Sequence, residues 1–144
     1  MKTKVIIVLA TMLAAGCSTT GSLNGTLTKY DAFYFDDADP MTGPLQKEIS
    51  YTLAHYGLQT ISATNRHDVL RCRVETDMGS VWNYSVKVVF FDDEKSVISV
   101  QASNNGWGTA IANGAAVNNL YSRTVQQLEA ELEKGGLHKH RLTE

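Results

Sequence analysis

Residues 69–103 read VLRCRVETDMGSVWNYSVKVVFFDDEKSVISVQAS and hold three segments in which apolar and polar residues alternate. Alternation with a period of two is typical of a β-strand that buries one side and exposes the other to solvent. The segments are 69–75, 82–91 and 96–103, and short polar connections join them. Because such connections link neighbouring antiparallel strands, the sequence predicts a three-stranded antiparallel meander.

A helix is expected on each side of this meander. Before it, Pro44 suits the first turn of a helix and Gly57 suits a left-handed C-cap. Helical spacing relates the apolar residues between them, which are Leu45, Ile49, Leu53 and Tyr56. After the meander, residues 115–134 predict a second helix that Gly135-Gly136 ends. Its apolar stripe consists of Val117, Tyr121, Val125, Leu128 and Leu132.

An aromatic-rich segment at 30–35 predicts one further strand and completes the order β-α-β-β-β-α. The expected fold is therefore α+β: a two-layer sandwich of a four-stranded, mainly antiparallel sheet with both helices on one face. The domain is expected to span 30–134. Residues 135–144 are expected to form a flexible C-terminal tail.

The amino-terminal residues have the layout of a secretory signal. Lys2 and Lys4 precede a short apolar run that extends from Val5 to Ala15, too short to cross a hydrocarbon core as a helix. The sequence Leu13-Ala14-Ala15-Gly16-Cys17 resembles a bacterial lipobox, in which the cysteine thiol is diacylated before cleavage and its freed amine takes a third acyl chain. This resemblance implies a signal peptide over 1–16 and lipidation at Cys17. Residues 18–29 are rich in Gly, Ser and Thr, so 17–29 are expected to be the lipidated cysteine and a flexible tether.

The net charge of the chain excludes some classes of binding partner. Removal of 1–16 leaves 11 basic and 15 acidic residues, a net charge of −4. A chain with this charge and no basic run lacks the electrostatic footprint of nucleic-acid binding and of anionic lipid recognition. Membrane attachment is therefore expected through the acyl chains. Because Ser18 rather than Asp follows the cysteine, the resemblance to sorted lipoproteins implies, for a two-membrane bacterium, the outer membrane, facing the periplasm.

No residue pattern indicates catalysis, a metal or a cofactor. Cys72 alternates with polar residues in a strand and is interpreted as a small buried hydrophobe. Asp36, Asp37 and Asp39 lack the glycine turn and distal Glu of a calcium loop, which favours a solvated turn. The histidines His67, His138 and His140 have no companion ligands at metal-site spacing.

The candidate contact residues are Arg71 and Arg73, on the polar side of a strand, and Trp107, which lies between two glycines. They favour a non-catalytic binding or assembly module of the cell envelope, with an envelope protein or peptidoglycan as partner. The alternatives left open are a metal-dependent or hydrolytic envelope enzyme with an unrecognised site, and an inert structural protein. Trp107 also has an alternative interpretation as a cap on the core.

Several short motifs resemble the DUF4136-like family of small bacterial lipoproteins of unknown function. They are Cys17, Tyr56-Gly57-Leu58, Asp68-Val69-Leu70, Phe90-Phe91-Asp92 and the glycine-rich loop before the last helix. The likeness covers most of 30–134. It implies an envelope location and an α+β fold, and it implies no reaction.

Overall fold

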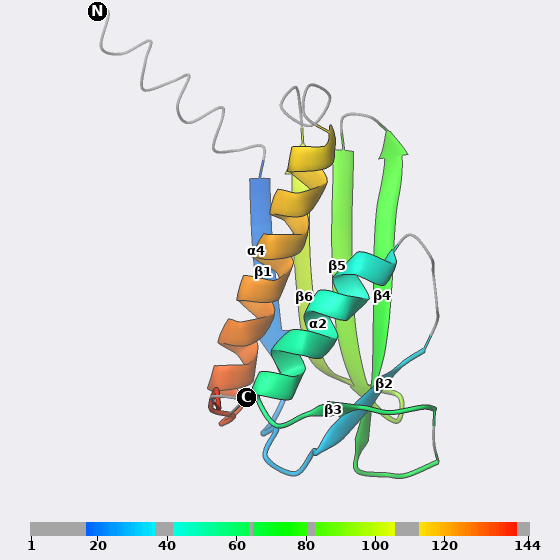
Figure 1. The fold of residues 1–144 in the computed structure, drawn as a ribbon, viewed down its shortest axis with the longest axis vertical. Helices are drawn as coiled ribbons and strands as arrows, with labels where there is room; N and C mark the ends of the chain where they lie inside the picture. Colours follow the sequence, from blue (N-terminus) through cyan, green and yellow to red (C-terminus); the bar gives the residue numbers. More distant parts are fainter. Residues whose placement is uncertain (1–16, 37–41, 64, 81–82, 106–112, 141–144) are drawn as a thin grey trace, which may run out of the picture.

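The computed structural model describes residues 17–36, 42–63, 65–80, 83–105 and 113–140. Figure 1 shows a sheet with two helices packed on the same face. The helices are α2 (Gly43–His55) and α4 (Asn113–Lys134). The strands are β1 (Cys17–Leu23), β2 (Ala32–Phe35), β3 (Gln59–Thr60), β4 (Val69–Ser80), β5 (Asn83–Asp92) and β6 (Lys95–Asn105).

The α+β class is confirmed, and so is the antiparallel meander β4-β5-β6. The predicted four-stranded sheet is wrong in its strand number and in part of its pairing. The described residues form a six-stranded mixed sheet in the order β1-β6-β5-β4-β2-β3, in which β2 runs parallel to both β3 and β4. The parallel arrangement follows from α2, which returns the chain to the starting end of the sheet between β2 and β4.

The core lies between the sheet and the two helices. Leu45, Ile49 and Leu53 on α2 are fully buried, as are Leu128 and Leu132 on α4. The sheet contributes inward-facing residues from its central strands: Leu70, Cys72, Val86, Val88, Phe90, Ile98, Val100 and Ala102, all at 0% exposure. The helical spacing and the strand alternation therefore identified the core correctly. Gly57 has φ +83°, which confirms the predicted left-handed cap after α2.

The predicted flexible tether is wrong for the residues that form β1. Cys17–Leu23 pairs with β6 from Cys17↔Asn104 to Leu23↔Ile98. Arg123 on α4 donates hydrogen bonds to the carbonyl oxygen of Ser18 (3.3 Å) and to Oγ1 of Thr19 (3.1 Å). The helix also approaches β1 so closely that a Cβ at Gly21 would lie 2.4 Å from Oε1 of Glu131. Backbone pairing and these contacts order a segment whose side chains offer little apolar surface.

The expectation of a flexible tail from residue 135 also needs correction. Gly135 is buried, and its carbonyl oxygen accepts a hydrogen bond from the backbone N–H of Leu27 at 3.0 Å. The backbone N–H of His140 donates to the carbonyl oxygen of His55 on α2 at 2.7 Å. Residues 135–140 thus pack on the domain, and the rest of the predicted tail lies outside the described residues.

The burial of Cys72 gives a first testable prediction. Cys72 is fully enclosed, and desolvation raises the pKa of its thiol well above its usual value. In a form that starts at residue 18, Cys72 is the single thiol, and we expect it to resist dithionitrobenzoate at pH 8. Release of the coloured product should begin when guanidinium unfolds the protein. Rapid reaction of the folded protein would contradict the burial.

Candidate functional site

The face of the sheet opposite the helices carries the polar residues of β4. Parallel pairing sets Tyr34 beside Arg71, and antiparallel pairing sets Arg71 beside Phe91. Since paired residues point to the same side of a sheet, these three side chains form a row on the open face. Arg73 lies two residues further along β4 and points to the same side.

A single carboxylate joins the two arginines. Oδ2 of Asp36 accepts hydrogen bonds from Nη2 (2.8 Å) and Nε (3.2 Å) of Arg73, and lies 3.6 Å from Nη1 of Arg71. The Asp36 side chain is 24% exposed. The partly buried setting makes these ion pairs stronger than fully solvated ones, because water screens them less.

Phe91 forms a platform for the same two side chains. The guanidinium carbons of Arg71 and Arg73 lie 5.0 Å and 5.5 Å from the centre of its ring. These distances are within the range of cation–π attraction, which stabilises a partly desolvated guanidinium by about 1 kcal/mol. Asp36, Arg71, Arg73 and Phe91 are called the arginine cluster below.

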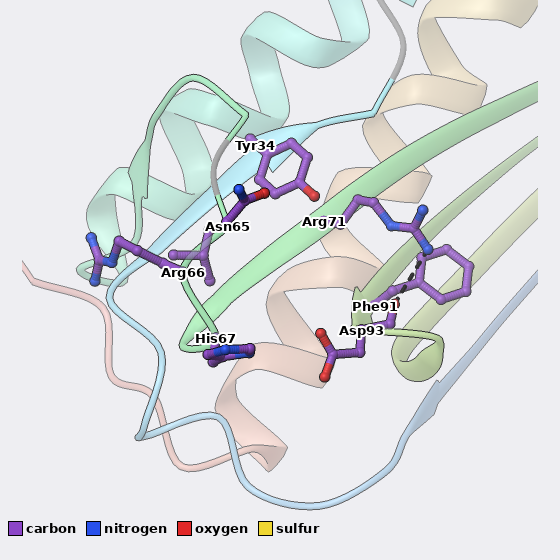
Figure 2. Close-up of a pocket in the computed structure, with 8 residues that line it drawn as sticks. Tyr34, Asn65, Arg66, His67, Arg71, Phe91 and Asp93 are labelled. Atoms are coloured by element: carbon purple, nitrogen blue, oxygen red, sulfur yellow. Dashed lines mark hydrogen bonds between the residues drawn. The ribbon is translucent and has the colours of Figure 1, made fainter.

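A shallow depression of about 290 Å³ opens beside the cluster. Figure 2 shows Tyr34, Arg71 and Phe91 around it, with His67 and Asp93 facing each other at its lower side. Figure 2 also shows the hydrogen bond that Nη2 of Arg71 donates to the carbonyl oxygen of Asp93 at 3.3 Å. The depression combines aromatic side chains with groups of both charges, which suits binding of a small polar group.

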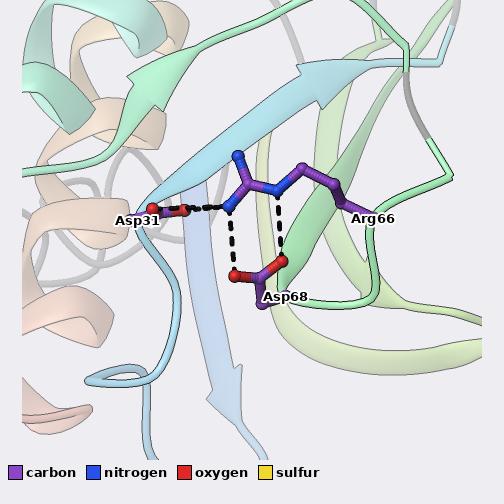
Figure 3. Close-up of polar contacts among 3 residues, drawn as sticks. All are labelled: Asp31, Arg66 and Asp68. Atoms are coloured by element: carbon purple, nitrogen blue, oxygen red, sulfur yellow. Dashed lines mark hydrogen bonds and ion pairs between the residues drawn. The ribbon is translucent and has the colours of Figure 1, made fainter.

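An ion-pair clamp fixes the loop that borders the depression. Arg66 donates from Nη2 to Asp31 (3.1 Å) and to Asp68 (3.1 Å), and from Nε to Asp68 (3.3 Å), as Figure 3 shows. The hydrogen bond from Arg66 lowers the pKa of the Asp68 carboxyl, and the same bond raises the pKa of Arg66. The clamp is solvent-exposed, so its role is to hold the loop beside β2 rather than to add much stability.

The candidate residues named from sequence have different outcomes. Arg71 and Arg73 come together over Phe91, whereas Trp107 lies outside the described residues. His67 borders the depression, and His138 and His140 belong to the segment that follows α4. Across 17–36, 42–63, 65–80, 83–105 and 113–140, no group of three or more His, Cys, Asp or Glu side chains is arranged to hold a metal ion.

Sequence reasoning missed the other members of the cluster. Asp36 belonged to an acidic run interpreted as a solvated turn, yet it pairs with both arginines. Tyr34 and Asp36 reach β4 through a parallel pairing that local sequence patterns do not reveal. Phe91 was recognisable as the outward member of the Phe90-Phe91 pair, because Phe90 continues the buried alternation.

No family model matches this chain, and no curated protein sequence does. Among solved structures, the fold is similar to that of PelC from Paraburkholderia phytofirmans. One PelC dodecamer superposes with a TM-score of 0.50 at 15% identity, over 88% of this chain and 99% of the PelC chain. A dodecamer of a PelC variant gives a TM-score of 0.48 at 16% identity, over 78% and 95%. At these identities the likeness concerns the fold alone. Within the described part of the chain, neither helix is long and apolar enough to span a membrane.

Proposed function

We propose that this chain is a membrane-anchored lipoprotein of the cell envelope that acts as a non-catalytic binding or assembly module. The anchor is a lipidated Cys17, in the outer membrane and facing the periplasm. The contact surface is the open face of the sheet around the arginine cluster. The observation that carries the proposal is that cluster: two arginines and one aromatic ring on a face that neither helix covers.

Composition supports recognition at this cluster. Arginine and aromatic residues dominate the energetics of protein interfaces because they combine a large contact area with directed polar groups. Asp36 and Phe91 hold both guanidiniums in place. A partner therefore binds side chains whose conformational freedom is already reduced, which lowers the entropy lost on binding. The fold is also the one on which PelC builds a dodecamer, which is consistent with an assembly role.

The position of Cys17 supports a short, stiff anchor. Cys17 is the first residue of β1 and pairs with Asn104. No free segment separates it from the sheet, so acyl chains on this residue would hold the domain close to the bilayer surface.

The distribution of charge along the sheet supports an orientation in which the end that carries Cys17 lies toward the membrane. At the Cys17 end of the sheet, residues 17–20, 78–80, 83–86 and 101–105 contain no Asp, Glu, Lys or Arg, and neither do residues 113–122 of α4. Figure 1 shows β1 starting at the end of the sheet where β4 ends and α4 begins. An end with few charges can lie against lipid head groups with little loss of ion hydration. The charged arginine cluster lies toward the other end and would face the periplasm.

Photo-crosslinking in living cells tests the module. A photo-reactive residue replaces Glu75, which is exposed on the cluster's face of β4, and a matched control replaces Gln126, exposed on α4. We expect a discrete envelope adduct from position 75 that decreases at least fivefold with Arg73→Ala and is missing from position 126. A third probe at position 107 tests the predicted contact of Trp107. Equal adducts from positions 75 and 126, or no effect of Arg73→Ala, would contradict the proposed surface.

A further inference from the structure

Among the described residues, Glu94 forms the longest of the ion pairs that involve Arg71 and Arg73. Its Oε2 lies 3.8 Å from Nη2 of Arg71, and its side chain is 95% exposed. The Arg71 side chain is only 21% exposed. A pair with one almost fully solvated partner contributes little to stability, because water competes for the carboxylate and the flexible side chain loses entropy.

The other contacts of Arg71 are held by the fold. Nη1 lies 3.6 Å from Asp36, and Nη2 donates to the carbonyl oxygen of Asp93. The ring of Phe91 packs against the guanidinium. Asp36 directly follows β2, Phe91 lies near the end of β5 and Asp93 begins the turn after it, so these groups orient the guanidinium whether or not Glu94 is present.

Glu94 adds a carboxylate to the surroundings of the two arginines. Arg71 and Arg73 bring two positive charges, and they share the carboxylate of Asp36. Glu94 supplies a second carboxylate from the solvent side of Arg71. A carboxylate on a ligand would meet the same guanidinium with the same chemistry, and it would replace a weak intramolecular partner.

We infer that Arg71 binds the carboxylate of a ligand seated in the adjoining depression, and that this carboxylate replaces Glu94, which pairs with Nη2 of Arg71 in the free protein. The inference deepens the proposed function, because it assigns a ligand chemistry to the same face. The ligand class is a molecule with a single free carboxylate, such as the C-terminus of a short peptide. Its body lies on Tyr34 and Val69, which line the depression beside Arg71.

Asp93 limits the ligand to a low negative charge. Its side chain also lines the depression and, in Figure 2, faces His67 across the lower side. A dianionic phosphate at Arg71 would be repelled by the carboxylates of both Asp36 and Asp93, whereas a single carboxylate meets less repulsion. The clamp of Arg66 keeps the bordering loop in position, which lowers the entropy lost on binding.

Titration of the full chain followed by NMR tests the inference through the arginine Nε–Hε signals. The probe is N-acetyl-alanyl-alanine, the matched control ligand is its C-terminal amide, and inorganic phosphate is the third arm. We expect the acid to shift the Arg71 signal and the amide to leave it unchanged. Glu94→Gln should tighten binding of the acid about threefold, because a surface pair of this kind opposes the ligand by a fraction of a kcal/mol. Arg71→Gln should weaken it at least tenfold.

Glu75→Gln is the matched control, since it removes an exposed carboxylate from the same face, four residues along β4 from Arg71. It should leave the affinity for the acid unchanged. Equal binding of acid and amide, preferential binding of phosphate, weaker binding in Glu94→Gln, or no binding of the acid would each overturn the inference. None of these results would remove an envelope adduct formed from position 75, so the failure of this site and the failure of the proposed module are distinguishable.

Discussion

Val86→Asp is expected to unfold the domain. Val86 lies at 0% exposure in the central strand β5 and pairs with Thr76 and Ala102. The substitution loses about 2 kcal/mol of apolar burial and brings a carboxylate into the core. The charged group must either be buried without a partner or draw water into the core, so we expect a total loss of about 5 kcal/mol or more. Domains of this size are stable by about 5–15 kcal/mol, so the loss removes between about a third and all of the free energy of unfolding, and we expect a sharp fall of the folded fraction at 37 °C.

Urea denaturation followed by circular dichroism measures this effect. The matched control is Gln101→Asp, which puts the same carboxylate on the exposed face of β6, in register with Lys87. It should change the free energy of unfolding by no more than about 0.5 kcal/mol. A cooperative transition near the wild-type midpoint in Val86→Asp would mean that residue 86 is not enclosed as the register requires.

The sequence predicted the elements in which the local residue pattern matches the observed burial, namely the two helices and the meander β4-β5-β6. Val86, Val88 and Phe90 alternate with polar or less buried neighbours, and each faces the helices. The apolar stripes of α2 and α4 repeat at the helical period because one side of each helix packs on that sheet. In these segments a window of about ten residues is enough to predict the type of element and its buried side.

β1 shows why other parts of the sheet were not predicted. Its residues Ser18, Thr19, Thr20 and Ser22 offer hydroxyl groups on both sides, so no alternation identifies a buried face. The groups that order it are distant along the chain: its partner strand is β6, and Arg123, which donates to Ser18, is 105 residues away. The arginine cluster has the same origin: Asp36 reaches Arg73 only through the parallel pairing of β2 with β4. Contacts that depend on register between distant strands leave no local signal.

Cys17→Ala is expected to abolish acyl labelling and leave an uncleaved precursor. The proposed lipid attaches to a thiol, and Ala provides none. One acyl chain would give only marginal membrane binding, with an association constant of about 10⁴ M⁻¹, whereas several chains anchor firmly. Incorporation of an alkyne-tagged palmitate in living cells, read on a gel, measures the effect. The gel also reports cleavage, because loss of residues 1–16 changes the mobility.

Cys72→Ala is the matched control, because Cys72 is the other cysteine of the chain. Its sulfur is fully buried and its thiol is kept neutral by a raised pKa, so it is no acceptor for an acyl chain in the folded protein. Labelling of Cys72→Ala should equal that of the wild-type protein. Persistent labelling of Cys17→Ala would contradict the proposed lipid anchor at this residue. The fold is expected to survive the change at residue 17, since Cys17 joins β6 through its backbone and Ala pairs in the same way. Loss of labelling with an unchanged melting temperature would therefore separate the role of Cys17 as an anchor from that of β1 as an edge strand.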